Sequence, residues 1–356
     1  MGSRVSSVSI EPFLRKMPKV ELHVHLEGTF QPATLLSLAR KNGVPLPADD
    51  EAGLERWFRF RDFDHFVEIY VTCSRCLKDP ADFHRLALDF LAEQAVQNVL
   101  YSEVHFTIST HLWNGLDGEG IRQALDEAAA EALRRHGIRM RLIPDIVRNM
   151  ETERADATLR WAVDGKNDGV IAIGLAGIEL GYSNEPFRAH FATAKQEGLH
   201  CVAHAGETGG PDSIRSVLEV CGAERIGHGI RAIDDPALLQ RLVEDRIPLE
   251  VCPSSNVALG VVRSLEEHPV KRLLEAGIAV TINSDDPPLF GTDLTSEYLK
   301  LHRTFGYSRR QLAQLSMNGL RHAFLPTQEK AALEARFTEE FRALGVNLDI
   351  SNGLTS

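Results

Sequence analysis

The segment KVELHVHLEG, residues 19–28, is the stretch from which the fold of this chain can be worked out. Its apolar run predicts a buried strand, on which side chains two positions apart point to the same face. His23 and His25 therefore share one face of that strand. Neutral imidazole is the commonest side-chain ligand of transition metals, so the strand offers half of a metal site. An isolated pair of this kind is equally compatible with a structural role. Whether the two histidines are metal ligands therefore depends on which further ligands the rest of the chain supplies.

Short apolar runs like the first one recur along the chain, with amphipathic stretches between them. The runs cover residues 21–26, 100–106, 140–147, 170–175, 200–204, 225–228, 248–252 and 279–283. Helical patterns cover residues 82–98, 120–137, 184–198, 236–245 and 270–277, with a weaker one at 154–161. Eight strands that alternate with helices predict an α/β fold of the (β/α)8 type, a TIM barrel.

A long insert separates the first two predicted strands, from residue 31 to residue 98, and carries several helical patterns. It also contains a group of aromatic residues: Trp57, Phe58, Phe60, Phe63, Phe66 and Tyr70. This helical insert after strand one is expected either to cover the barrel mouth as a lid or to add a satellite core. We expect a flexible leader over residues 1–15, a single barrel domain over 16–345 and a C-terminal tail over 346–356.

Composition narrows the classes of partner. The 356 residues are 43% hydrophobic and carry a formal net charge of -11. A negative chain is a poor match for a nucleic-acid backbone, although a single nucleotide or nucleoside stays open as substrate. The sequence has neither an apolar run of about 18 residues, as a membrane span requires, nor a signal peptide. We therefore expect a cytoplasmic protein without a membrane partner, and the oligomeric state stays open.

Polar residues gather where four of the predicted strands end, which is the end of a barrel that carries chemistry. Each has an ordinary explanation when taken alone: a hydrogen-bonded core histidine, a solvated loop carboxylate or a helix cap. Four such clusters at four strand ends are hard to explain by core packing. They consist of His23, His25 and Glu27 after the first strand, His204 and Glu207 after the fifth, His228 after the sixth, and Asp285 and Asp286 after the eighth.

Three imidazoles and one carboxylate from these clusters make a plausible zinc site with room for a water molecule. Zinc lowers the pKa of bound water from about 15.7 to about 7, which provides hydroxide at neutral pH. Glu207 is then a candidate proton shuttle, and His228 a candidate group to orient the hydroxide. Iron and manganese remain alternatives to one Zn2+ per subunit. The predicted ligands are His23, His25, His204 and Asp285.

At these positions the chain resembles the adenosine deaminase family. The matching segments are PKVELHVHLEG (18–28), LAG (175–177), HAGE (204–207), RIGHG (225–229) and INSDDP (282–287). They follow the order of the family and span nearly the whole chain, so that as a set they are specific. The resemblance implies a zinc (β/α)8 barrel that hydrolyses the 6-amino group of a purine.

The resemblance also implies a role for each matching residue. Glu207 would protonate purine N1 while hydroxide attacks C6, and His228 would hold the hydroxide and stabilise the developing negative charge. Asp286 would bind N7 and the backbone of Gly177 would bind N3. The expected substrate contacts are His25, Glu27, Gly177 and Asp286. The expected metal ligands are the four residues named above.

Two features bear on the substrate. Glu27 stands where the mammalian-type enzymes have Asp, near the 5′ end of the ribose. The segments LEVCPSSN (249–256) and SDDPPLFGTD (284–293) look more like a bacterial branch that includes 6-aminodeoxyfutalosine deaminases of the futalosine route to menaquinone. The benzoate arm of that substrate favours a cation and an aromatic wall, which Arg59 and Arg61 in WFRFR (57–61) can supply unless they are simply solvated. Aminodeoxyfutalosine therefore ranks first, adenosine second and adenine third.

A different functional class stays open as well. Other amidohydrolases of this fold commonly place a carboxylated lysine on the fourth strand, and IAIGLAG (171–177) contains none. A catalytically inactive binding protein should have lost a ligand or the acid, and none is missing here.

Overall fold

The computed structural model describes residues 9–348 and forms one eight-stranded parallel sheet in the order β1 to β8. Each strand pairs with the next one along the chain, so the predicted barrel is confirmed. Strands buried on both faces read as continuous apolar runs, which is why the pattern was visible in the sequence. The strands are β1 Lys19–His25, β2 Val99–Phe106, β3 Arg139–Val147, β4 Ala172–Ala176, β5 His200–Ala205, β6 Arg225–His228, β7 Leu249–Val251 and β8 Val280–Ile282.

The barrel closes between β8 and β1 through residues that follow the short strand β8. The backbone N–H of Leu22 donates to the side-chain oxygen of Asn283 over 2.9 Å. Further along the seam, the N–H of His25 donates to the carbonyl of Asp285 over 2.9 Å, and the N–H of Asp285 donates to the carbonyl of His23 over 3.2 Å. The closing bonds therefore hold Asp285 directly beside the two histidines of β1.

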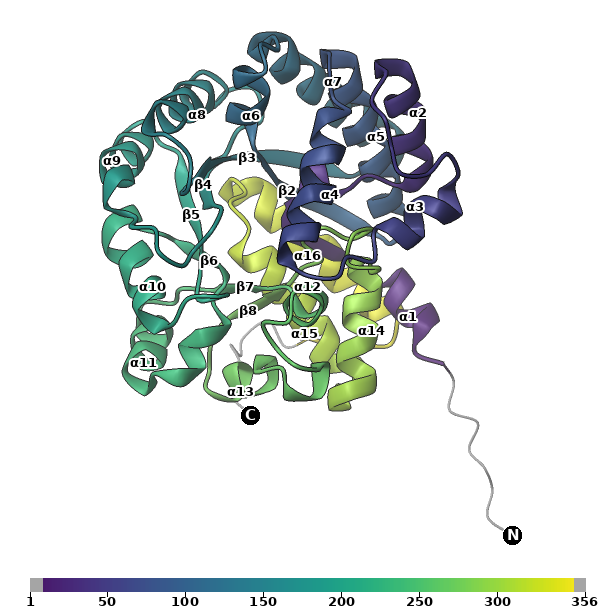
Figure 1. Cartoon of the computed structure of the whole chain (residues 1–356). Coiled ribbons are helices and arrows are strands. Elements are labelled where there is room, and N and C mark those ends of the chain that lie inside the picture. Colours follow the sequence, from purple (N-terminus) through teal and green to yellow (C-terminus); the bar gives the residue numbers. More distant parts are fainter. Residues whose placement is uncertain (1–8, 349–356) are drawn as a thin grey trace.

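Helices surround the barrel and follow the strands as expected (Figure 1). All six helical patterns found in the sequence correspond to helices, including the weak one, which is a full helix. In chain order they are α5 Pro80–Val96, α7 Gly118–His136, α8 Thr152–Asp164, α9 Arg188–Gln196, α11 Pro236–Glu244 and α13 Val270–Glu275. Shorter elements follow β2, β5, β6 and β7: α6 Ile108–Trp113, α10 Pro211–Ser216, η4 Ile230–Asp234 and α12 Pro253–Ala258.

The insert between β1 and β2 is helical, and its aromatic residues pack both on the core and on a loop at the carboxyl end of the barrel. Phe58 is buried and contributes to the core. Phe66 instead stacks on Phe290 in the loop after β8, with ring centroids 5.3 Å apart, so α4 is tied to the carboxyl end of the barrel. Figure 1 shows α4 in front of the strands. Before α5, the insert consists of η1 Leu26–Gly28, α2 Pro32–Asn42, α3 Glu51–Trp57 and α4 Phe63–Arg75.

The ends of the chain correct the expected domain bounds. Residues Glu11–Lys16 form helix α1 and bury Phe13 and Leu14, so the expectation of a flexible leader is wrong for residues 11–15. The side chain of Val346 is also buried, so packed chain extends past the expected boundary at residue 345. Residues 1–8 and 349–356 of the expected leader and tail lie outside the described residues.

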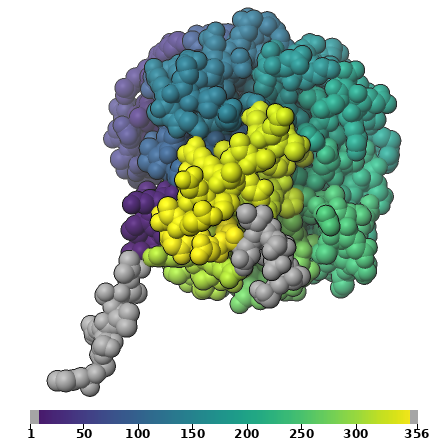
Figure 2. All heavy atoms as spheres, turned by 180° about the vertical axis from the view of Figure 1, so that it is seen from behind, coloured from purple at the N-terminus to yellow at the C-terminus, as the bar shows by residue number. Residues whose placement is uncertain are grey.

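In the described part of the chain, three helices follow β8, and the connection between the last two lies at the amino end of the barrel. They are α14 Leu294–Phe305, α15 Arg309–His322 and α16 Thr327–Ala343, and Figure 2 shows the last of them on the opposite side of the molecule. The ring of Phe324, between α15 and α16, stacks on His200 at the start of β5 with centroids 4.0 Å apart. Among the described residues, no helix is both long and apolar enough to cross a membrane.

Candidate active site

Three imidazole rings from two opposite strands meet at the carboxyl end of the barrel. His23 and His25 come from β1, and His204 comes from β5. The ring centroids of His23 and His204 lie 4.5 Å apart, and the Nε2 atoms of His25 and His204 lie 3.1 Å apart. All three side chains are buried. Gly227 on β6 makes room for them, because a Cβ there would lie 2.8 Å from Cε1 of His23.

Hydrogen bonds on the far side of two rings direct lone pairs toward this meeting point. Nδ1 of His23 lies 2.8 Å from Oε2 of Glu250 and donates a hydrogen bond to that carboxylate. Nδ1 of His204 donates to the carbonyl of Leu175 over 3.0 Å. In its neutral form each of these two rings has an unprotonated Nε2, and Nε2 of His23 has no hydrogen-bond partner among the described residues. Histidine ligands of metals usually have this arrangement, in which the second ring nitrogen is held by a carboxylate or a carbonyl.

Asp285 adds a carboxylate to the three imidazoles. Its Oδ1 lies 3.4 Å from Nε2 of His25 and 3.6 Å from Nε2 of His23. Its backbone has φ of 66°, a left-handed conformation that non-glycine residues rarely adopt and that is enriched at functional sites. Three imidazole nitrogens and one carboxylate oxygen within this space have the donor chemistry of a zinc site. The four predicted ligands are thus brought together, and they fit a metal ion.

Glu207 and His228 lie beside this cluster. Oε1 of Glu207 is 3.7 Å from Nε2 of His228, which in turn is 3.9 Å from Oδ2 of Asp285. Burial, together with the charge of Asp285, raises the pKa of Glu207 to about 8, so its carboxyl group holds a proton at neutral pH. Burial lowers the pKa of His228 to about 4, so its ring is neutral.

Asp286 presents a second carboxyl group from the same loop. Burial and the adjacent charge of Asp285 raise the pKa of Asp286 well above its usual range, and its Oδ1 has no hydrogen-bond partner among the described residues. Gly28 makes room for it, since a Cβ at that position would lie 1.7 Å from Oδ1 of Asp286. Gly177 directly follows β4 in a left-handed conformation, with φ of 87°.

Glu27, a predicted substrate contact, already has three partners in the protein. Its carboxylate accepts from the backbone N–H of Thr107 over 3.0 Å, from Nε2 of His111 over 3.1 Å and from the hydroxyl of Tyr70 over 3.3 Å. The residue is 1% exposed. Burial opposes its charge, but the contact with His111 lowers the pKa of Glu27 below its ordinary value. Glu27 therefore links the first strand to α4 and α6.

Several buried ionisable residues that were not predicted as site residues lie directly behind the histidines. Glu250 holds His23, and Asp145 on β3 lies 3.6 Å from Nδ1 of His25 and 2.9 Å from Nδ1 of His105. The sequence feature that could have revealed Glu250 and Asp145 is an ionisable residue inside an apolar run, as in LEVC (249–252) and LIPDIV (142–147). Such residues are almost never fully buried unless they are paired, so their position inside a strand was informative.

The loop that carries Glu207 is held by another carboxylate that was not predicted. Glu179 accepts from the backbone N–H groups of four consecutive residues: Gly206 over 2.5 Å, Glu207 over 3.2 Å, Thr208 over 2.9 Å and Gly209 over 2.7 Å. Burial opposes its charge, but these hydrogen bonds contribute to a lowered pKa of Glu179. The charged acceptor thus fixes the backbone from which Glu207 projects.

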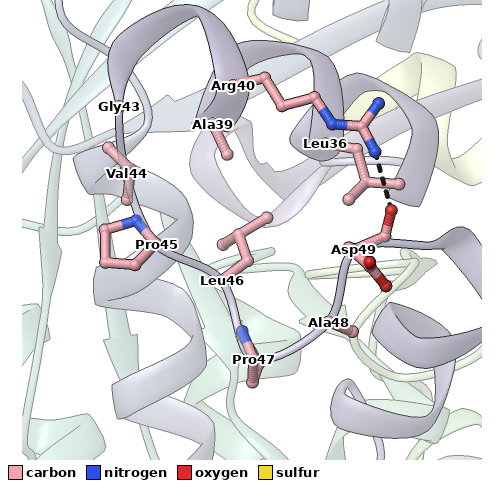
Figure 3. Close-up of a pocket in the computed structure, with 10 residues that line it drawn as sticks. All are labelled: Leu36, Ala39, Arg40, Gly43, Val44, Pro45, Leu46, Pro47, Ala48 and Asp49. Carbon is pink, nitrogen blue, oxygen red and sulfur yellow. Dashed lines mark hydrogen bonds between the residues drawn. The ribbon is translucent and has the colours of Figure 1, made fainter.

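The protein also has a surface groove of about 780 Å³, which shares no lining residue with this site. It is formed by α2 and the segment 43–49, where Arg40 donates to the carbonyl of Asp49 over 2.8 Å (Figure 3). None of its ten lining residues belongs to the clusters at the strand ends.

Known proteins resemble the chain over nearly its full length. A family model described as adenosine deaminase matches residues 18–340. An aminodeoxyfutalosine deaminase of Streptomyces coelicolor is 40% identical over 327 residues, which make up 91% of this chain and 84% of the relative. An adenine deaminase of Hahella chejuensis is 36% identical over 330 residues, 93% of this chain and 98% of the relative.

Solved structures share the same architecture. The crystal structure of an adenine deaminase from Arthrobacter aurescens has a TM-score of 0.87 and 32% identity, covering 92% of this chain and 99% of that one. An amidohydrolase from Burkhoderia ambifaria, solved with bound Zn, has a TM-score of 0.87 and 26% identity, covering 96% of each chain. The similarity therefore extends over nearly the whole barrel domain.

Proposed function

Because this chain belongs to the adenosine deaminase family, and is therefore a metal-dependent hydrolytic deaminase of purine-type substrates, we propose that it acts on 6-aminodeoxyfutalosine. The products would be ammonia and the 6-oxo nucleoside, on the futalosine route to menaquinone. The observation that carries this proposal is the 40% identity to an aminodeoxyfutalosine deaminase over 91% of the chain.

We propose that His23, His25, His204 and Asp285 hold one Zn2+ per chain. When bound, zinc lowers the pKa of water to about 7 and so supplies a nucleophile at neutral pH. The proposal is supported by Nε2 of His23, which has no hydrogen-bond partner among the described residues, and by the 3.1 Å separation of Nε2 of His25 from Nε2 of His204. Glu250 and the carbonyl of Leu175 keep two of the rings in the ligand tautomer.

The chain's own residues then bind and protonate the base. Glu207, protonated at neutral pH because burial raises its pKa, donates its proton to purine N1. Asp286, whose pKa is raised by burial and by the charge of Asp285, donates a hydrogen bond to N7 in its protonated form. The backbone N–H of Gly177 donates to N3, and His228 stabilises negative charge as it develops on the oxygen at C6. His25 lines the same space as a further contact to the substrate.

The substituent beyond the ribose would lie under the helical insert. Tyr70 on α4 donates to Glu27, so α4 and the residue expected near the 5′ position are already connected. Arg59 and Arg61 are exposed, and we propose that they bind the carboxylate of the benzoate arm. We also propose that the enzyme is cytoplasmic and has neither a membrane nor a nucleic acid as partner, the latter in keeping with its net charge of -11.

Adenine is the second candidate substrate, because adenine deaminases occur among both the relatives and the solved structures. Adenosine remains the alternative nucleoside. A base without ribose would leave Glu27 bound only to its three protein partners. The nucleoside substrates and adenine therefore differ in whether contacts between enzyme and substrate extend beyond the purine.

The proposal is tested by measuring kcat/KM of the zinc-loaded enzyme on aminodeoxyfutalosine, adenosine, methylthioadenosine and adenine, using the ultraviolet change of the base. The highest kcat/KM is expected for aminodeoxyfutalosine. A preference for adenine would support the second candidate, and no change with any of the four compounds would contradict the deaminase assignment.

The role of Glu207 is tested with Glu207→Gln, which keeps the size of the side chain but cannot carry the proton. We expect kcat to fall about 100- to 10,000-fold while the zinc content is retained. Glu197→Gln, at an exposed glutamate beyond α9, is the matched control and should keep full activity. Near-full activity of Glu207→Gln would show that another group carries the proton.

A further inference from the structure

A line of three buried side chains leads from the start of α13 to the reaction centre. They belong to His268, Asn256 and His228. The backbone N–H of Val270 lies 3.1 Å from Nδ1 of His268. Nε2 of His268 lies 3.1 Å from Oδ1 of Asn256 on α12, and Nδ2 of Asn256 lies 3.2 Å from Nδ1 of His228. The three side chains are between 0% and 3% exposed, so water does not compete for these hydrogen bonds.

The direction of every hydrogen bond in this line follows from its first member. A backbone N–H can only donate, so Nδ1 of His268 accepts and carries no proton. The proton of that ring is therefore on Nε2, and it is donated to Oδ1 of Asn256. The amide of Asn256 then turns its N–H2 group toward His228, and Nδ1 of His228 accepts.

The reverse orientation of the Asn256 amide is excluded by the same argument. A flipped amide would place its N–H2 group against the N–H of His268, so that two donors would face each other. It would also place its oxygen against Nδ1 of His228. Buried polar groups in native proteins nearly always have partners, so a mismatch at this depth is strongly disfavoured.

From this geometry we infer that His268 and Asn256 are positioning residues that keep the proton of His228 on Nε2. The inference rests on the function proposed above and assigns His228 its part in it. The N–H of His228 is directed into the space beside Glu207 and Asp285, whose oxygens lie 3.7 Å and 3.9 Å from Nε2. Both distances exceed that of a hydrogen bond, so the N–H remains available for the oxygen that attacks C6.

This protonation state decides between two roles for His228. A ring with a proton on Nε2 can donate a hydrogen bond to an oxygen on which negative charge develops, but it cannot remove a proton through the same nitrogen. His228 is therefore a hydrogen-bond donor in the reaction, and Glu207 is the group that carries the proton.

Nuclear magnetic resonance of the zinc-loaded enzyme tests the inference without any turnover, so its result does not depend on the proposed substrate. The 14 histidines are labelled with nitrogen-15, and the signal of His228 is identified by its loss in His228→Gln. The expected spectrum shows a protonated Nε2 and an unprotonated Nδ1 for His228. A proton on Nδ1 of His228 in the wild-type enzyme would overturn the inference.

Asn256→Asp tests the control exerted by Asn256, because its side chain has nearly the same shape but offers only acceptors to His228. We expect Nδ1 of His228 to become protonated in this variant. An unchanged His228 spectrum in a folded, zinc-loaded variant would refute the role of Asn256.

His268→Phe tests the first link of the line. We expect kcat per bound zinc to fall about 10- to 100-fold, with a smaller change in KM, because loss of an orienting partner has effects of this size. His268→Gln can still donate to Asn256 and should restore part of the loss. His190→Phe is the control: His190 on α9 is also buried and bonded, to Asp156 over 2.8 Å, but lies outside the line. Wild-type kcat per zinc in His268→Phe would contradict the inference.

Discussion

The histidines of the site depend on charged residues buried behind them. Glu250 accepts a hydrogen bond from Nδ1–H of His23 and also binds Arg225, with 2.6 Å between its Oε1 and the Nε of Arg225. Arg225 binds Glu103 on its other side over 2.5 Å. Burial opposes the charge of Glu250, yet Arg225 and His23 lower its pKa to about 2. Because the charges are mutually paired, the barrel interior can hold a carboxylate that keeps His23 in its ligand tautomer.

Lys19, at the start of β1, yields a prediction about the pH dependence of stability. It is 0% exposed, and its Nζ donates to the carbonyls of Leu14 and Met17 over 2.6 Å and 2.8 Å. Burial lowers the pKa of Lys19 to about 7 from an ordinary value of 10.5. Between these two values the unfolded chain binds one more proton than the folded chain. The free energy of unfolding therefore rises with pH in this window, by at most about 1.4 kcal/mol per pH unit from this group.

The measurement compares the wild-type enzyme with Lys19→Met by urea unfolding at pH 7, 8, 9 and 10. Subtracting the free energy of unfolding of Lys19→Met from that of the wild type removes the contribution of the other titrating groups. This difference should increase with pH. A difference that is independent of pH would mean that Lys19 remains charged in the folded protein.

Among the elements, the connection between β4 and α9 holds the backbone of the loop that carries Glu207. Glu179 in this connection accepts from four consecutive N–H groups of the loop after β5. Arg148, after β3, adds a second tie: it donates to the carbonyl of His204, to that of Gly177 over 3.3 Å and to Oδ1 of Asn184 over 2.9 Å. Loops after three neighbouring strands are thereby held together around Glu207.

We predict that Glu179→Ala lowers kcat about 10- to 100-fold with unchanged zinc content, because the backbone of Glu207 loses its anchor. The measurement is steady-state kinetics together with metal analysis. Glu185→Gln, in the same connection but exposed and paired with Arg188, serves as the control. Equal kinetics for the two variants would show that the loop keeps its conformation without Glu179.

At the scale of the whole molecule, the proposed ligands join opposite sides of the barrel. His23 and His25 lie on β1, His204 lies on β5, and Asp285 follows β8 at the closing seam. A metal ion bound by all four would cross-link these strands in the folded state only. A ligand that binds only the folded state raises stability by mass action, by about 4 kcal/mol at 1,000 times its Kd.

We therefore predict that removing the metal with a chelator lowers the Tm by several degrees, and that added Zn2+ restores it. Differential scanning calorimetry measures the change. His204→Ala should have a Tm that no longer responds to the chelator, and the same response in this variant would place the metal elsewhere.

The sequence predicted the barrel and the residues that the structure brings together in the candidate site, because both depend on local patterns. Eight strands buried on both faces appear as eight apolar runs, and clusters at the strand ends appear as polar residues directly after them. Glu250, Asp145 and Glu179 were not selected, because a single ionisable residue does not reveal its partner. Glu179 binds a loop 27 to 30 residues further along the chain, and Glu250 binds a histidine 227 residues away.

By itself, the sequence determined the number and type of the strands, the four polar clusters and the membership of His23 and His25 in a larger set. Only the tertiary structure decided which ring nitrogens face the site and which carboxyl groups have a raised pKa. It also decided that residues 11–15 belong to the folded domain and that Glu27 is bound by the insert. The physical reason is that protonation, tautomer and burial depend on partners from distant strands, which barrel closure alone brings within hydrogen-bond distance.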